Sequence, residues 1–575
     1  MKSITSIKLS TRCICATILG ASLVCSTVLA QNGKGGNNGN GNGNGNNGNN
    51  GNGNGGNPNP TPNPNPPPGV NGFGVAIPVP VLNMAQFLTN GPNQDPDATF
   101  LNQRIQQNYH NALEQLAAAP PGSSKFTQAL GKALIYDQTL SVNNVTGNKN
   151  VACATCHIDY SGFTGASSFF NGTTSADPGA VPITNAGGRG PDYRIGNRKP
   201  QSYAYAPFSG VLHFNVAQQD FYGGNFWDMR ATGIRLGNPA AEQAQGPPVN
   251  PLEHALFDIP TYVYKLSKSD YASFFEEYWG KGSLSSINWP PNIETFAATP
   301  GPAPSPDPLL AQLSQADQNL VMSAYDHAAM SMAAYEAGPE VSPFTSKFDY
   351  ALANPTQSVL TKDELEGWNL FRGKAQCNTC HLDGTENIKK GKITPADAAS
   401  VAPLFTDFTS ANIGTPQNFA LPFLYENMPD QFGFVANPAG INYVDLGVGG
   451  FLASAGNPNP DWAALAPQFN GKVQVPTLRN VDLRPRPDFV KAYMHNGYFK
   501  TLESVVHFYN TRDTLNGGVH LPAGGEFEGG LYWPPPEVNM NVDQTIGHLG
   551  LSAKEEEQIV LFMKTLTDGY VPSNP

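Results

Sequence analysis

The residues best suited to chemistry in this sequence form two copies of one motif, C-x-x-C-H: Cys153-Ala-Thr-Cys156-His157 and Cys377-Asn-Thr-Cys380-His381. In this motif two thiols lie on one helical turn, from which they can add to the two vinyl groups of a haem. The adjacent histidine can then bind the iron as its proximal ligand. The two motifs therefore predict two covalently bound haem c groups, with His157 and His381 as iron ligands.

The other cysteines support this interpretation. The sequence has seven cysteines, and Cys13, Cys15 and Cys25 lie in the first thirty residues. If that segment is removed, only the four haem cysteines remain, so neither a structural disulfide nor a separate zinc site can form. The alternative is one zinc site made of all four thiolates. It explains neither the histidine after each pair nor the long separation between the pairs.

Residues 1–30 are typical of a secretory signal peptide. An apolar run over 14–29 follows a basic start and ends in small residues suited to cleavage after Ala30; the basic residues are Lys2, Lys8 and Arg12. Export agrees with c-type haem attachment, which resembles a process completed outside the cytoplasm. We therefore expect a periplasmic, secreted or surface-tethered protein. A lipid anchor at Cys25 is the alternative, although Val24 is large for that cleavage site.

Residues 31–72 are predicted to be a disordered linker. Asn and Gly alternate through residue 57, and a Pro-rich stretch follows over 58–68. With so few apolar residues, this segment cannot offset the entropy lost on ordering. It is either a spacer that holds the protein away from a membrane or partner, or a tolerated low-complexity tail. Beyond the signal, no stretch approaches the roughly 20 apolar residues of a membrane span.

The remaining chain is long enough for two mainly α-helical domains with long loops, each with one haem. Helices are expected over 97–118 and 307–336, and capping boxes at Thr361 and Ser552 start two more. A further helix is expected over 502–510. The formal net charge of −12 disfavours nucleic acid as a partner and favours basic electron-transfer proteins.

Four further motifs, in order, resemble those of the bacterial di-haem cytochrome c peroxidase and MauG superfamily: Phe226-Trp-Asp-Met-Arg230, Gln243 to Glu253, Val475-Pro-Thr-Leu-Arg-Asn480, and His495-Asn-Gly497 followed by Thr501-Leu-Glu503. The resemblance covers about residues 120–570. It implies two class I cytochrome c-like domains, a peroxidatic haem domain at 73–345 and an electron-transfer haem domain at 346–575.

The resemblance also implies an acid–base group. A carboxylate beside an open iron site can take a proton from peroxide and return it to the leaving oxygen. The family places Glu253 there, with Gln243 as a polar orienting group and Pro247 shaping the pocket. Trp227 matches the tryptophan that lies between the haems in this family, an expected electron route; a core tryptophan is the alternative.

The axial positions resemble the MauG branch. No histidine follows His157 before His213, which implies an open first iron, with His213 as the alternative ligand. At the second haem, the position fourteen residues after His495, a methionine in peroxidases, is Tyr509. Tyr509 is therefore the expected ligand of the second iron, and Met494 is its rival. A phenolate favours the ferric state more than a thioether does.

The calcium site of the family is altered in this sequence. Its asparagine falls at Arg198, with Asn197 one place early, and its carbonyl pair falls at Val490 and Ala492. The sequence therefore does not favour calcium.

Three functions compete, and the first is preferred: an exported oxidoreductase that reacts with hydrogen peroxide at the first haem and transfers electrons from the second. A small cytochrome c or a copper protein would be its electron donor. The second is a MauG-like enzyme that uses a high-valent di-haem state to oxidise residues of a partner protein. Against it, Ala375 replaces a surface-route tryptophan of MauG. The third, a non-catalytic electron carrier, gives the Glu253 motif no purpose.

Overall fold

The computed structural model describes residues 96–142, 151–165, 194–384, 403–430, 432–515 and 533–572, together with strand β1 (Ser175–Ala176). The predicted signal peptide 1–30 and linker 31–72 lie outside the described residues and stay predictions. Within the described ranges, every helix is too short or too polar to cross a membrane.

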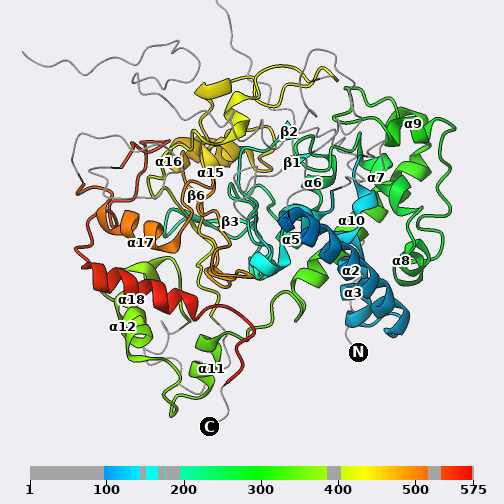
Figure 1. The fold of residues 1–575 in the computed structure, drawn as a ribbon. Coiled ribbons are helices and arrows are strands. Elements are labelled where there is room, and N and C mark those ends of the chain that lie inside the picture. Colours follow the sequence, from blue (N-terminus) through cyan, green and yellow to red (C-terminus); the bar gives the residue numbers. More distant parts are fainter. Residues whose placement is uncertain are drawn as a thin grey trace, which may run out of the picture.

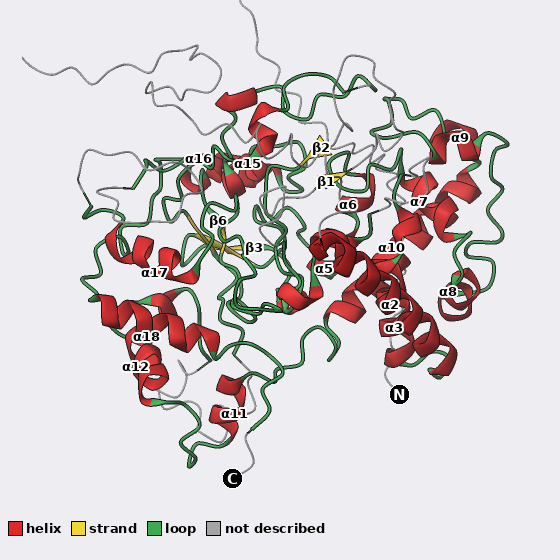
Figure 2. Ribbon diagram, viewed as in Figure 1, coloured by secondary structure: helices red, strands yellow, loops and turns green. Residues whose placement is uncertain are grey.

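Helices and loops make up most of the described chain, and strands are short (Figure 2). The fold is therefore mainly α, as predicted. The described strands form three antiparallel pairs: β1 with β2 (Arg194–Ile195), β3 (His213–Asn215) with β4 (Asp220–Tyr222), and β5 (Ser410–Ala411) with β6 (Val473–Gln474).

The first helical group surrounds a large apolar core, on the right of Figure 1. Helix α3 (Ser124–Tyr136) packs against both α2 (Pro96–Ala118) and α10 (Gln315–Glu336). Gly131 permits the contact with α10, because a Cβ atom there would lie 2.0 Å from the carbonyl oxygen of Ser331. Three shorter helices complete the group: α5 (Pro239–Ala244), α7 (Ile259–Leu266) and α8 (Ala272–Trp279).

The helix predicted over 97–118 is confirmed as α2, but the start predicted for the helix over 307–336 is wrong. Helix α10 begins at Gln315, because the Ser314 hydroxyl accepts a hydrogen bond from the Asp317 amide at 3.2 Å and so caps the first turn. The residues before it form a separate 3₁₀ turn, η5 (Leu310–Gln312).

The second helical group lies on the left of Figure 1 and contains α12 (Lys362–Arg372), α17 (Leu502–Thr511) and α18 (Ala553–Lys564). The capping boxes at Thr361 and Ser552 are confirmed, and the helix expected over 502–510 is α17. Helix α11 (Lys347–Ala353) also belongs to this second group. The core of the group is aromatic and includes Phe348, Phe371, Phe405 and Phe562.

The two halves of the chain also pack directly on each other. The hairpin β3–β4 from the first half covers α15 (Gly447–Leu452) and α16 (Ala466–Phe469) from the second. The ring of Phe221 meets the ring of Phe469 edge-on, with centroids 5.0 Å apart. The hairpin therefore closes a small third core between the halves.

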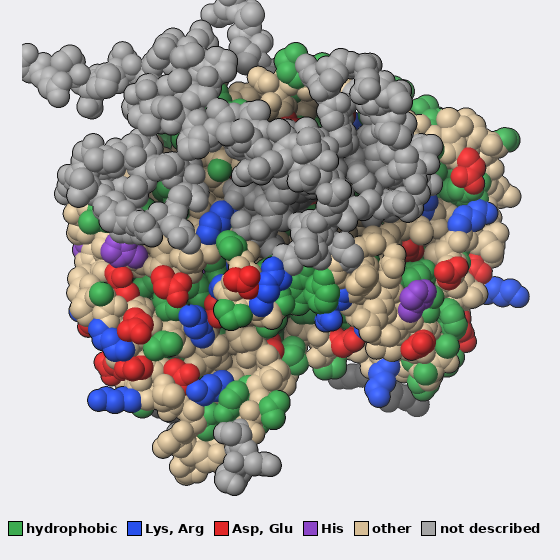
Figure 3. Space-filling model, viewed as in Figure 1, with side chains coloured by type: hydrophobic (Ala, Val, Ile, Leu, Met, Phe, Trp, Pro, Cys, Tyr) green, Lys and Arg blue, Asp and Glu red, His purple; other side chains and the backbone are tan. Residues whose placement is uncertain are grey.

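Charged side chains of both signs are interspersed on the face shown in Figure 3. On the protein surface, charges of opposite sign also meet in ion pairs such as Lys374 with Glu555, at 2.8 Å. Such exposed pairs add little to stability. The excess negative charge is therefore not gathered into a single patch on this face.

The remaining elements are short and lie in the connecting loops: η2 (Gln138–Leu140), α4 (Cys153–Cys156), η3 (Asp159–Ser161), η4 (Ala206–Phe208), α6 (Gly246–Val249), α9 (Ile293–Ala297), η6 (Cys377–Thr379), η7 (Pro422–Tyr425), η8 (Gly440–Asn442) and η9 (Pro460–Leu465). Two of them, α4 and η6, carry the C-x-x-C-H motifs.

The contact between α12 and α18 gives a stability prediction. A Cβ atom at Gly367 would lie 1.9 Å from the carbonyl oxygen of Gln558, so Gly367→Ala must push the helices apart. We expect this substitution to lower the free energy of unfolding by about 1–3 kcal/mol in a denaturant titration. Gly210→Ala is the control, because a Cβ atom there meets nothing within 4 Å. Equal stability of both variants would contradict the close approach.

Candidate active site

The first motif presents its histidine in the form that iron binding requires. Cys153 and Cys156 lie on the single turn α4, and His157 follows directly. The His157 Nδ1 lies 3.1 Å from the carbonyl oxygen of Phe163, which can only accept a hydrogen bond. The proton is therefore on Nδ1, and the Nε2 lone pair is left for a metal. Burial lowers the pKa of His157 to about 4, so the imidazole is neutral.

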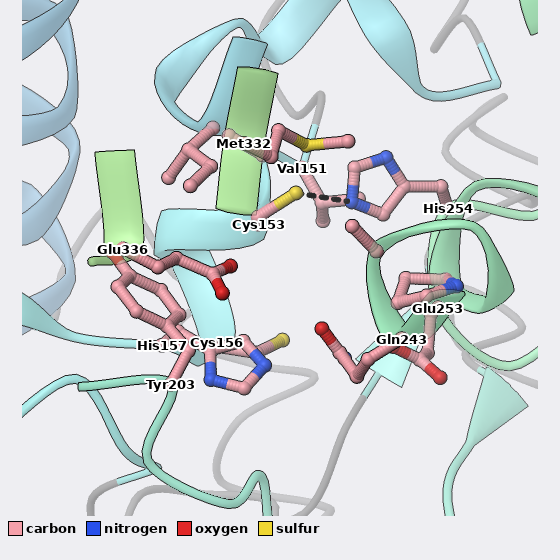
Figure 4. A pocket seen from close by; sticks show the side chains of 14 residues that line it. Val151, Cys153, Cys156, His157, Tyr203, Gln243, Glu253, His254, Met332 and Glu336 are labelled. Atoms are coloured by element: carbon pink, nitrogen blue, oxygen red, sulfur yellow. Dashed lines mark hydrogen bonds between the residues drawn. The ribbon is translucent and has the colours of Figure 1, made fainter. Parts of the chain in front are cut away.

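A cavity opens beside this motif (Figure 4). Both cysteines and His157 lie on one side of it and Gln243 and Glu253 on the other, and Pro247 also lines it. An adjoining cavity shares His157, Gln243 and Glu253 and extends to Trp227. The structure therefore brings the residues of three separate sequence motifs to one place.

Local hydrogen bonds position the far side of the cavity. Asn238 caps α5, the helix of Gln243, by accepting from the amides of Ala240 and Ala241. The Asn250 Nδ2 donates to Glu253 Oε1 at 2.6 Å, and its Oδ1 accepts from the Leu252 amide. The turn over 250–253 is thus held by a single side chain, which fixes the direction of the Glu253 carboxylate.

The electrostatics of Glu253 suit a group that exchanges protons. Burial raises its pKa, while the positive charge of Arg230 and the hydrogen bond from Asn250 act in the opposite direction. The Arg230 guanidinium is held 3.7 Å above the Phe226 ring and pairs with Asp228 at 2.9 Å. A carboxyl whose pKa is raised by burial holds a proton more readily than an ordinary glutamate, which suits a group that both accepts and releases one.

The cavity contains two ionisable groups that sequence reasoning did not assign to it. His254 is buried, with Nδ1 donating to the carbonyl oxygen of Leu140 at 3.0 Å and Nε2 lying 3.8 Å from Cys153 Sγ. Glu336, at the end of α10, is also buried, and burial raises its pKa well above the ordinary value. The position of His254 directly after Glu253 is a sequence signal for its place in the cavity, whereas Glu336 has no such signal.

The donor set of this cavity fits a haem c group. It offers two thiols for attachment, one imidazole nitrogen for the iron and apolar walls from residues such as Ile135 and Met332. The Tyr203 hydroxyl and Glu336 Oε2 are buried without a partner within the described structure. Unsatisfied buried polar atoms are costly in an empty apolar cavity, whereas a polar-edged ligand can satisfy them.

His213, the alternative ligand of the first iron, lies elsewhere. It is exposed on β3, its Nδ1 is 3.0 Å from the carbonyl oxygen of Val211, and its ring stacks on Tyr222. It lines neither of the two cavities described above. Its neighbours therefore give it a role in the hairpin.

The second motif repeats the arrangement of the first. Cys377 lies on η6, and the His381 Nδ1 is 3.0 Å from the carbonyl oxygen of Phe405, which leaves Nε2 for a metal. Burial lowers the pKa of His381. This donor set also fits a haem c group.

Both candidates for the second axial ligand lie near this motif. Tyr509, on α17, and Met494 pack against the apolar cluster that Cys377 also contacts. Burial raises the pKa of Tyr509, and the next contributions come from Cys377 and Cys380. Tyr509 and Met494 are thus both placed beside the second motif.

Trp227 lies between the first cavity and the segment that leads to α17. Its indole Nε1 donates to the carbonyl oxygen of Lys199 at 2.8 Å, and its ring centroid is 6.4 Å from that of His495. Ala375, in contrast, is fully buried in the core beside the second motif. Residue 375 is therefore not at the surface.

The residues at the expected calcium position do not fit a calcium ion. Asn197 donates its amide to the Tyr443 hydroxyl, and the Arg198 guanidinium lies between the carboxylates of Asp228 and Asp445. The Arg198 guanidinium therefore already pairs with the carboxylate oxygens that a calcium ion would need. In the described chain, moreover, no group of three or more His, Cys, Asp or Glu side chains is arranged to hold a metal.

Comparison with known proteins agrees with this geometry. The profile of a family described as di-haem cytochrome c peroxidase matches residues 125–357. The methylamine utilization protein MauG of Paracoccus denitrificans is 27% identical over 443 residues, which are 76% of this chain and 88% of that protein. The chain is therefore similar to the di-haem cytochrome c peroxidase and MauG superfamily, whose members carry two c-type haems. It is accordingly an oxidoreductase of this kind.

Two other relatives agree with this assignment. Cytochrome c551 peroxidase of Nitrosomonas europaea is 24% identical over 301 residues, which are 52% of this chain and 64% of the relative. The crystal structure of the diheme peroxidase BthA from Burkholderia thailandensis has a TM-score of 0.50 at 21% identity, covering 78% of this chain and 87% of BthA. The architecture is thus that of a di-haem peroxidase.

The charge of Arg230 gives a pH prediction for this di-haem enzyme. Burial raises the pKa of Glu253. As the pH falls, Glu253 is therefore protonated at a higher pH than an ordinary glutamate. Arg230→Gln removes a charge that lowers this pKa, so the acid limb of the rate of peroxide reaction should move to higher pH. The measurement is the stopped-flow rate against pH. Arg235→Gln, which breaks the exposed pair with Asp326, is the control; an unmoved limb in Arg230→Gln would contradict the assignment.

Proposed function

We propose that this enzyme reduces hydrogen peroxide at the haem of the first motif, with electrons that arrive through the haem of the second. The observation that carries the proposal is the convergence of Gln243, Pro247 and Glu253 on the cavity beside His157. An electron carrier would have no use for a carboxyl and an amide placed in such a cavity opposite the haem-binding motif. When bound, the haem iron of the first motif would supply Lewis acidity, and the two haems together would supply the two electrons that reduction of hydrogen peroxide needs.

The roles of the protein groups follow from their positions. Asn250 holds Glu253 Oε1, which leaves Oε2 to take the proton from the near oxygen of peroxide and return it to the leaving oxygen. Gln243, on α5, offers an amide that orients the substrate from the same side. Pro247 is buried against the cavity and limits the space for water.

The finer assignments belong to the same proposal. The two helical groups support domains at 73–345 and 346–575, each with a class I cytochrome c-like arrangement around one haem. Export to the periplasm or the cell surface rests on the predicted signal peptide 1–30. The net negative charge favours a small basic cytochrome c or copper protein as the electron donor.

A second candidate is oxidation of residues in a partner protein, as the similarity to MauG suggests. It is favoured by Tyr509 beside the second motif and by the absence of a histidine between His157 and His213 in the sequence. The buried position of Ala375 argues against an electron route to the surface through that residue. Rapid turnover of a reduced small cytochrome would favour the peroxidase, and a long-lived oxidised state with slow turnover would favour the second candidate.

The peroxide reaction should depend on the Glu253 carboxylate. We expect Glu253→Gln to keep both haem spectra and to bind cyanide without prior reduction, because the ligands and the cavity remain. Its reaction with hydrogen peroxide should slow by about 10²–10⁴-fold, the usual loss for a general acid–base group. The measurement is a peroxide titration of the ferric protein with stopped-flow optical detection. A rate equal to that of the wild type would overturn the proposal.

The second-haem ligand can be identified by substitution. If Tyr509 binds the iron, Tyr509→Met should keep low-spin ligation and raise the reduction potential of that haem, because a thioether favours ferrous iron more than phenolate does. Met494→Leu is the matched variant and should leave both potentials unchanged. Potentiometric titration and EPR of the purified variants measure this. The reverse pattern would identify Met494 as the ligand.

A further inference from the structure

Arg198 forms a buried ionic bridge between the two halves of the chain. Its Nη1 donates to Asp228 at 2.7 Å, while Nε and Nη2 donate to the two oxygens of Asp445, each at 2.6 Å. Burial by itself would raise the pKa of Asp445, but the charge and hydrogen bonds of Arg198 lower it below its ordinary value. The bridge is therefore fully charged, and its bidentate geometry fixes the direction of the guanidinium.

The bridge is linked twice to Trp227. The first link is covalent, because Asp228 directly follows Trp227 in the chain. The second runs through Lys199, which directly follows Arg198. The carbonyl oxygen of Lys199 accepts a hydrogen bond from the Trp227 indole at 2.8 Å. The dipeptide Arg198-Lys199 is thus joined to the dipeptide Trp227-Asp228 by one ion pair and one hydrogen bond. Rotation or displacement of the indole would have to break one of these links.

The same bridge leads to His495, on the other side of the indole. The Asp445 amide donates to Glu537 Oε1 at 2.9 Å, and Glu537 Oε2 lies 3.5 Å from His495 Nε2. The Lys199 amide donates to the carbonyl oxygen of His495 at 2.7 Å. Arg198, Asp445, Glu537, His495 and Lys199 are therefore connected in a ring of contacts. These contacts fix the orientation of the indole relative to the segment that carries His495.

We infer that Arg198 is the fixed internal cation that positions Trp227 between the two haem motifs, in place of a bound calcium ion. A divalent ion would need oxygen donors, but Asp228 and Asp445 are already neutralised by the guanidinium, and Asn197 is engaged with Tyr443. An arginine cannot dissociate as a metal does. The electron-transfer part of this inference rests on the proposed function, whereas the calcium part does not.

The calcium part is tested on the wild-type holoenzyme. We expect elemental analysis after purification in calcium-containing buffer to find far less than one calcium per protein. Excess EGTA should leave the optical spectra, both reduction potentials and the peroxide reaction unchanged. Stoichiometric calcium, or a change in spectra or potentials on chelation, would overturn the inference whether or not any variant folds.

The positioning part is tested with Arg198→Gln and Arg198→Lys. After rapid mixing with peroxide, the reaction of the first haem and the later oxidation of the second haem can be followed as two successive steps. We expect Arg198→Gln to retain the first step and to slow the second by at least about tenfold, since small displacements of a reacting group have effects of this size. Arg198→Lys, which keeps the charge without the bidentate geometry, should restore part of the rate.

Two further variants complete the experiment. Asp445→Asn, which preserves shape and removes one partner charge, should slow the same step, and Arg235→Gln on the surface should not. Wild-type rates for the second step in Arg198→Gln and Asp445→Asn would overturn the positioning role. Loss of the first step in the wild-type enzyme would instead contradict the proposed function, so the two failures are distinguishable.

Discussion

The hydrogen bond from each motif histidine to a backbone carbonyl is the interaction on which the functional architecture depends. The bonds from His157 to Phe163 and from His381 to Phe405 decide which imidazole nitrogen is free, and they aim that nitrogen away from the backbone. Each acceptor carbonyl belongs to a loop rather than to the motif itself. The loops must therefore be held correctly before either histidine can serve as a ligand, and the helical cores on both sides of the molecule provide that support.

The buried and half-buried ionisable side chains around the two cavities are of two kinds. Arg198, Asp228 and Asp445 are paired into a charged bridge whose members compensate one another. Glu253 and Glu336 lack such strong compensation, and burial raises their pKa values. The ion-paired side chains fix the geometry of the site, whereas Glu253 and Glu336, whose pKa values are raised, hold a proton more readily. In the proposed mechanism the first kind holds the site, and Glu253, of the second kind, exchanges protons within it.

Much of this arrangement could be predicted from the sequence, and the failures have physical reasons. The capping boxes at Thr361 and Ser552 are local signals, so the helices that follow them begin where expected. The start of α10 was misplaced because Leu309, Leu310 and Leu313 continue the apolar pattern on the N-terminal side of Ser314, the residue that caps the helix. Glu336 was missed because its burial depends on tertiary packing. Arg198 was recognised as an altered position, but its partner Asp445 is 247 residues away, and such a pairing has no local signature.

The hairpin β3–β4 has a consequence for how such a protein can evolve. Because Phe221 of the first half completes a core with Phe469 of the second, each half carries an apolar surface that only the other half covers. A gene fragment encoding one haem unit would encode an incomplete protein, exposing a patch that promotes aggregation. Recombination that exchanges one haem unit between relatives must therefore also exchange, or match, this contact. The contact of the hairpin with α15 and α16 thus couples the evolution of the two units.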